Sequence, residues 1–160
     1  MHSTGPILFA LENAPAIILP LIREVPEAIL KRRPSAKKWS AHEHACHLAV
    51  VHPIFSSRLD LILNEDQPHI RPYLPGEQDA DDALLRLDLN ESMEKFVSDR
   101  QLLLTRLRQL SPDDWARTAT HDEYSQYSVL IMFRHLAMHD MFHSYRIEEL
   151  LLKKDWNQDH

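Results

Sequence analysis

Apolar residues recur every three or four positions along most of this chain, the spacing expected of helices with one buried face. Four long stretches show this period, at 7–25, 41–64, 88–110 and 128–153. Proline-rich or polar segments separate them. Glycine occurs only at Gly5 and Gly76 in 160 residues. Since proteins rich in strands and tight turns use more glycine, the pattern predicts an all-α protein.

Capping residues predict where three of these helices begin. Ser40 is followed three residues later by Glu43, and Asp88 by Glu91. Both pairs match the capping box, in which two side chains bind the free amide groups of a helix start. Ser128 is the expected cap of the last long helix, because its hydroxyl can accept from a first-turn amide.

Prolines are expected to disturb the helices, because proline has no amide hydrogen and its ring clashes with the preceding turn. We expect the helix at 7–25 to be interrupted or to restart around Pro15 and Pro20, with Asn13 capping the restart. Pro53 is expected to kink the second long helix.

The connections predict the topology. Short helical segments are expected at 26–30, 79–87 and 112–115. The segment 65–78 contains three prolines and one glycine without periodicity, so we predict a long crossover loop between the second and third long helices. Four long helices with one such loop predict a four-helix bundle, formed by a single domain over 1–160.

Composition excludes several classes of protein. With 18 basic and 24 acidic residues, the net charge of -6 gives no basic surface for nucleic acid or for an anionic membrane. A single cysteine, Cys46, excludes an internal disulfide and fits a reducing compartment. We find no signal peptide and no stretch that approaches a membrane span. A cytoplasmic location is therefore expected.

The third long helix carries a wider apolar band than one buried stripe requires, formed by Phe96, Leu102, Leu103, Leu104 and Leu107. The first helix is similarly apolar, and its expected buried stripe is Ile17, Ile18, Leu21 and Ile22. Both features predict a two-fold homodimer that packs through the long helices. Alternatively, the band lies under the 65–78 loop.

Eleven histidines carry the candidate chemistry. His139 and His143 are one helical turn apart, so both can reach one metal ion. This spacing is weak on its own, because about 0.7 such pairs are expected by chance. The pair falls, however, on an apolar seam where leucine would be expected: Val129, Met132, Leu136, His139, His143, Arg146 and Leu150.

The helix expected at 41–64, with its cap, has a second seam in which polar residues stand where apolar ones are expected. Its members are Ser40, His44, His47, Val51, Ile54, Arg58 and Leu61. Bundle cores often collect histidines from two helices to bind a metal. The residues leave a second interpretation open, in which these are core histidines that hydrogen-bond to each other or to carboxylates.

The geometry of an α-helix argues against a role in the candidate site for three neighbouring residues. His135 lies about 12 Å from His143 along the helix axis, so one ion cannot bind His135, His139 and His143 together. Adjacent helix residues point about 100° apart. Cys46 is therefore not expected to share an ion with His47, and Asp140 is not expected to serve as the general base beside His139.

The residues around the first histidine resemble those of the DinB-like, YfiT-related family of four-helix bundles. The matching residues are Trp39, Ser40, Glu43, His47, Leu48, Ala49, Arg58 and Leu59, together with His139 and His143 in the last helix. This resemblance covers nearly the whole chain. It implies that His47, His139 and His143 are the metal ligands, and it selects His47 over His44 and gives His135 no ligand role.

Two positions depart from the family pattern. His52 stands where an acidic residue is common, and Pro53 follows it. Arg146 stands where glutamine commonly follows the last ligand, which places a cation near the expected site. That arginine could bind an anionic substrate group or pair with a carboxylate.

Three histidine ligands leave a fourth position open, as in catalytic zinc sites. The family includes thiol-dependent transferases, so the resemblance implies a metal-dependent hydrolase or a thiol transferase that acts on a small molecule such as a thiol. The implied ion is divalent, zinc or nickel. Alternatively, the metal is structural in a binding or stress-response protein, or the site is vestigial. The sequence indicates neither the substrate nor a catalytic residue.

Overall fold

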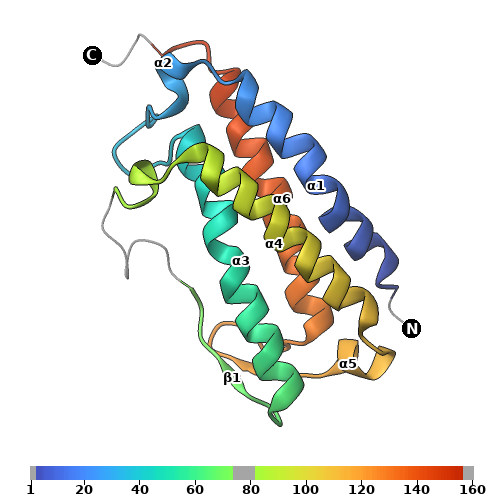
Figure 1. Ribbon diagram of the computed structural model, residues 1–160. Coiled ribbons are helices and arrows are strands. Elements are labelled where there is room, and N and C mark those ends of the chain that lie inside the picture. The colour runs from blue at the N-terminus through green and yellow to red at the C-terminus, as the bar shows by residue number, and fades with distance from the viewer. Residues whose placement is uncertain (1–2, 74–81, 157–160) are drawn as a thin grey trace.

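The computed structural model describes residues 3–73 and 82–156. Four long helices form a bundle (Figure 1): α1 (Gly5–Glu24), α3 (Ala41–Asn64), α4 (Leu89–Gln109) and α6 (Val129–Leu151). Three short elements lie in the connections: α2 (Glu27–Leu30), the 3-10 turn η1 (Leu84–Arg86) and α5 (Pro112–Ala116). The predicted four-helix bundle is confirmed.

The long crossover follows from the directions of the helices. Helices α3 and α4 run in the same direction, opposite to α1 and α6 (Figure 1). Around the bundle each helix packs against two neighbours, in the order α1, α6, α3, α4. Because the consecutive helices α3 and α4 are parallel, the chain between them must return along the length of the bundle.

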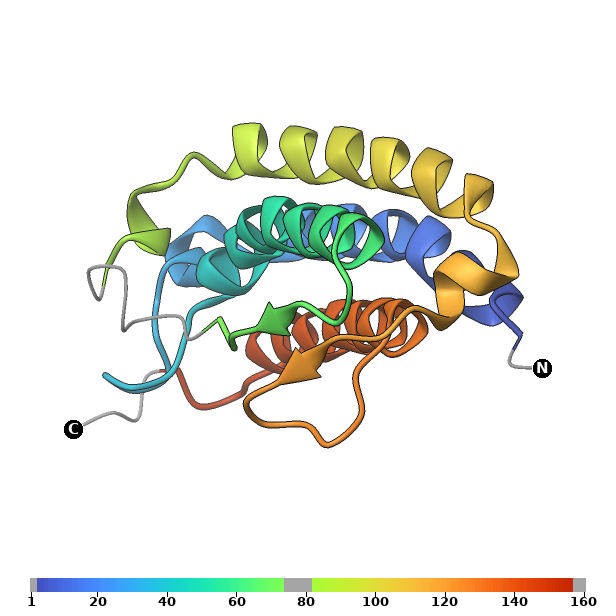
Figure 2. The same ribbon diagram turned by 90° about the horizontal axis from the view of Figure 1, so that it is seen from below.

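A short parallel strand pair, which the sequence did not predict, lies in the connections. β1 (His69–Ile70) follows α3, and β2 (Thr120–His121) precedes α6. His69 is opposite Thr120, and Ile70 is opposite His121. Figure 2 shows the two strands next to each other. The strands therefore join the start of the crossover to the loop that enters the last helix. Of the helix expected at 79–87, the structure shows η1, and 79–81 lie outside the described residues.

Helix α1 continues through both of its prolines, so the predicted interruption is wrong. Asn13 does not cap a restart, because its side-chain amide donates to the Phe9 carbonyl within the helix. Packing holds α1 on both sides of Pro15, through the buried residues Ile7, Leu11, Ile18 and Ile22. Ile17, expected in this stripe, is instead 61% exposed.

The predicted helix starts are present. The Ser40 hydroxyl accepts from the Glu43 amide, and the Glu43 carboxylate accepts from the Ser40 amide, which confirms the capping box of α3. Asp88 accepts from the Glu91 amide at the start of α4. Ser128 accepts from the amide of the third residue of α6.

The apolar band on α4 mostly faces the core. Four of its five residues are buried, namely Phe96, Leu103, Leu104 and Leu107, whereas Leu102 is 67% exposed. Strand β1 lies on the α3 and α6 side of the bundle and not over α4 (Figure 2). Intramolecular packing therefore accounts for most of the band, and the homodimer stays a prediction.

Within the part of the chain that the structure describes, two helices are long and apolar enough to cross a membrane by length and composition alone, contrary to the expectation from the sequence. They are α1 and α3, with mean hydropathy of 1.6 and 1.2 over their most apolar windows. Core helices pass the same test, and both helices pack inside this bundle. No membrane role follows from their composition.

One buried arginine connects all four long helices. Arg100 of α4 is 1% exposed. Its guanidinium lies 2.7 Å from the Asp140 carboxylate of α6 and donates to His52 Nε2 of α3 over 3.1 Å. It also donates to the Leu11 carbonyl of α1 over 2.7 Å. That carbonyl has no helical partner, since Pro15 lacks the amide hydrogen that would bind it.

We expect Arg100→Met to destabilise the protein by about 3–5 kcal/mol, because it leaves the Asp140 carboxylate buried without its cation. The free energy of unfolding in urea measures the effect. The matched control is Arg108→Met, since Arg108 pairs with Glu12 at the surface. Arg108→Met should lower the free energy of unfolding by less than about 1 kcal/mol. Equal effects of the two substitutions would contradict the role of Arg100.

Candidate metal centre

Three predicted histidines meet between α3 and α6. Nε2 of His139 lies 3.1 Å from Nε2 of His47 and 3.0 Å from Nε2 of His143. One nitrogen from each ring falls within a group that spans 4.8 Å. His47 and His143 are buried and His139 is half-buried. The structure thus brings together the residues that the sequence selected.

The spacing of the nitrogens fits a single ion. Tetrahedral zinc with bonds of 2.0–2.1 Å separates its nitrogen ligands by about 3.3 Å. The two separations from His139, 3.1 and 3.0 Å, are slightly shorter, and the nitrogens of His47 and His143 lie within 4.8 Å of each other. Rotation of the rings would bring the three nitrogens to the distances that one ion requires. Hydrogen bonds explain the cluster less well, because one ring nitrogen offers a single hydrogen or a single lone pair and His139 Nε2 contacts two neighbours.

Burial keeps these imidazoles neutral. Loss of hydration, together with a smaller effect of neighbouring charges, lowers the pKa of His47 to about 3 and the pKa of His139 to about 4. The same causes lower the pKa of His143. A metal ligand must present a free lone pair, so the three rings are in the protonation state that binding requires at neutral pH.

His44 contacts the outer nitrogen of a candidate ligand. Its Nδ1 lies 2.8 Å from Nδ1 of His143. Burial lowers the pKa of His44 to about 4, so both rings are neutral and the contact holds one hydrogen. If His143 donates that hydrogen, its Nε2 keeps a lone pair for the metal. His44 acting as the acceptor therefore selects the binding tautomer of His143.

Sequence reasoning missed this role of His44. Its place three residues before His47, on the same face of α3, was the available signal. The family pattern set His44 aside as a ligand, and His44 is not part of the group of three converging nitrogens. A hydrogen bond that orients a ligand from outside the metal site is common in metalloproteins.

Aromatic rings cover the cluster. The Trp39 ring lies 4.8 Å from the His47 ring and stacks on the His143 ring at 5.9 Å. Tyr73, from the crossover segment, stacks on His47 at 6.3 Å. Trp39 served in the sequence only as a marker of the helix start. In the structure it forms an apolar wall beside the candidate ligands.

Arg146 does not occupy the core seam, which corrects the prediction for this position. It is exposed and pairs with Glu149 over 2.7 Å. Ile147 takes the buried position instead. The Arg146 charge still helps to lower the pKa of His143.

The remaining candidates face other partners. His135 is exposed and its ring lies 5.6 Å from that of Tyr124. His52 binds Arg100, and Cys46 Sγ contacts His42 Nε2 at 3.5 Å. None of these three residues joins the nitrogen cluster.

The buried carboxylates nearest in sequence to the candidate ligands are engaged by arginine. Glu43 pairs with Arg33 and accepts from Ser40. Asp140 pairs with Arg100, as expected for a side chain that points away from the cluster. Neither carboxylate is free to act as a general base.

Comparison with known proteins identifies the family of this chain. Residues 10–145 match the model of the DinB superfamily. A protein of Oceanobacillus iheyensis named "Putative metal-dependent hydrolase" is 32% identical over 119 residues, which are 74% of this chain and 68% of that protein.

Solved structures show the same fold. YfiT from Bacillus subtilis, described as "a probable metal-dependent hydrolase with an unusual four-helix bundle topology", has a TM-score of 0.82 at 21% identity, over 92% of this chain and 85% of YfiT. A DinB-like protein of Bacillus subtilis has a TM-score of 0.60 at 12% identity, over 91% and 90% of the two chains. The resemblance seen in the sequence is confirmed, and the chain belongs to the DinB superfamily.

Proposed function

We propose that this protein is a metal-dependent hydrolase in which His47, His139 and His143 hold one divalent ion. The observation that carries the proposal is the convergence of three neutral Nε2 atoms on one point. Three protein ligands leave a position for a small-molecule substrate, as in catalytic zinc sites. Imidazole ligands suit several divalent metals, zinc and nickel among them, and we propose one of these two.

The bound ion would supply a Lewis acid that polarises a substrate oxygen or activates a nucleophile. The protein's own residues then have separate tasks. His44 holds the tautomer of His143, and Trp39 covers one side of the cluster and limits access of water. A substrate would approach the ion from the side of His139, because His139 is half-buried whereas His47 and His143 are buried.

Thiol transfer is a second candidate, and the paired state of the carboxylates favours it. Hydrolysis commonly uses a general base, but Glu43 and Asp140 are each paired with arginine. A thiol requires only deprotonation, which coordination to a cation promotes. The competing role of a purely structural metal fits less well, since structural zinc sites usually have four protein ligands. The buried free thiol of Cys46 supports our proposal of a cytoplasmic location.

The reaction is tested with protein loaded with zinc or with nickel. Chromogenic carboxyl and phosphate esters report hydrolysis, and glutathione with chlorodinitrobenzene reports thiol transfer. We expect one of these reactions to depend on the added metal and to stop with a chelator. A protein that binds metal stoichiometrically and catalyses none of them would favour the structural role.

Replacement of His47, His139 or His143 by alanine should each lower the affinity for metal by at least about tenfold, because each removes one of three ligands. Elemental analysis after equilibrium dialysis against zinc measures occupancy. His135→Ala is the matched control and should bind as the wild type does. Full occupancy in His47→Ala would refute this ligand set.

His44 should act through its hydrogen bond. We expect His44→Leu to weaken zinc binding by about 10–100-fold, as found for other residues that orient metal ligands. His44→Asn should restore much of the affinity, because its amide oxygen can accept near the position of Nδ1. Competition with a chromogenic chelator measures both constants. Equal loss in the two variants would indicate a packing role and not a hydrogen-bonding one.

The lowered pKa values predict retention of metal in mild acid. Protons compete with the ion for the imidazole lone pairs, and exposed histidines with a pKa of about 6.5 release metal near that pH. Since the pKa of His47 is about 3 and that of His139 about 4, protons compete only at lower pH. Zinc occupancy should persist to roughly pH 5 and fall below it. Loss of zinc between pH 7 and pH 6, measured by dialysis, would contradict this prediction.

A further inference from the structure

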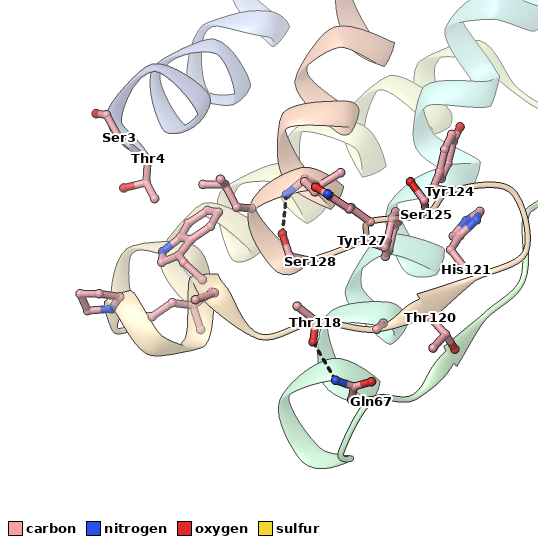
Figure 3. Close-up of a pocket in the computed structure, with 18 residues that line it drawn as sticks. Ser3, Thr4, Gln67, Thr118, Thr120, His121, Tyr124, Ser125, Tyr127 and Ser128 are labelled. Carbon is pink, nitrogen blue, oxygen red and sulfur yellow. Dashed lines mark hydrogen bonds between the residues drawn. The ribbon is translucent and has the colours of Figure 1, made fainter. Parts of the chain in front are cut away.

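A cavity of about 1170 Å³ lies at the end of the bundle where α6 begins. Its walls come from the residues that precede α1, from α5, and from the segment that joins β2 to α6 (Figure 3). Ligand cavities in proteins are commonly about 300–1000 Å³, so this space can hold a molecule of ordinary metabolite or drug size. The histidine cluster is elsewhere, since Ile131 of the cavity precedes His139 by eight residues, or about 12 Å of helix.

The lining of the cavity carries no formal charge. Among the described residues that line it there is no aspartate, glutamate, lysine or arginine. Burial lowers the pKa of His121 and raises that of Tyr127, so both rings are neutral at pH 7. Arg58, which is not a lining residue, acts on both rings and is hydrogen-bonded to Tyr127 and to the Arg71 carbonyl. An ionic ligand would lose hydration here without meeting an opposite charge in the lining itself, which disfavours it.

Aromatic rings give one wall a flat, stacked surface. The rings of Tyr124 and Tyr127 are nearly parallel, at 5° and 6.2 Å. His121 lies 4.6 Å from Tyr124 and 4.7 Å from Tyr127. Tyr124 is 42% exposed, so part of its face is open to a ligand, whereas Trp115 and Tyr127 are buried in the wall. Such surfaces favour an aromatic ring.

Polar groups at the cavity are oriented for a neutral partner. The Glu123 amide donates to His121 Nδ1, so the neutral ring carries its hydrogen on Nε2 and can donate it. Thr118 and Gln67 are hydrogen-bonded to each other across the lining (Figure 3). Gln67 has a φ of 47°, the left-handed region that residues other than glycine seldom adopt. Strain of this kind is often found at ligand sites.

We propose that this cavity is a second binding site, separate from the metal centre, and that it takes an uncharged aromatic molecule with a hydrogen-bonding substituent. The ring stacks beside Tyr124 and Tyr127, and the substituent accepts from His121 Nε2. The absence of charge in the lining and the aromatic wall together define this ligand class.

Naphthol and naphthalenesulfonate are suitable probes, because they share one ring system and differ in charge. Fluorescence titration at pH 7 should show that naphthol binds to the wild-type protein at least tenfold more tightly than the sulfonate. Equal affinity, or tighter binding of the sulfonate, would overturn the proposal.

Two variants locate the binding. Tyr124→Ala removes the open ring and should weaken naphthol binding at least tenfold, and Ser125→Trp should fill the cavity and do the same. The matched control is Tyr145→Ala, since Tyr145 is also exposed, at 60%, but lies in the second half of α6, away from the cavity at the start of that helix. It should bind naphthol as the wild type does, and so should His143→Ala. A comparable loss of naphthol binding in Tyr145→Ala, or no loss of binding in either cavity variant, would overturn the proposed site.

Discussion

A charge buried among four helices constrains this structure more than any other interaction. Arg100 and Asp140 are both removed from water, so the ion pair is stable only while His52 and the Leu11 carbonyl also accept from the guanidinium. Arg100 and these three partners come from four separate helices. The arginine thereby fixes the relative positions of the helices, and it satisfies the carbonyl that Pro15 leaves without a helical partner.

The candidate metal centre depends on the same alignment. Asp140 follows His139 directly in α6, and His52 lies little more than one turn after His47 in α3. Arg100 thus joins α3 and α6, the two helices that supply the candidate ligands, at positions close to those ligands in sequence. A metal site tolerates only small errors in ligand position, so a rigid ionic contact behind it favours convergence of the three Nε2 atoms.

The sequence by itself determined the helices and the ligand candidates. The apolar period, the Ser40 and Glu43 capping box and the proline-rich crossover act locally, so they could be interpreted residue by residue. The His139 and His143 spacing is equally local, because both residues lie on one helix. A second seam on another helix offered both His44 and His47, and choosing His47 required the family resemblance, because periodicity predicts which face is buried but not which residues are in contact.

Only the tertiary structure decided how buried polar groups are paired. Local rules predicted a break at Pro15, but Arg100, 85 positions away, donates to the free carbonyl and the helix continues. They placed Arg146 in the core, but the packing of α6 turns it to the surface and buries Asp140 and Ile147. The local rules predicted no partner for His44, whereas in the structure its ring contacts His143 of α6. In each case the favourable state of one polar group depends on another that is distant in sequence, and a helical period carries no information about that pairing.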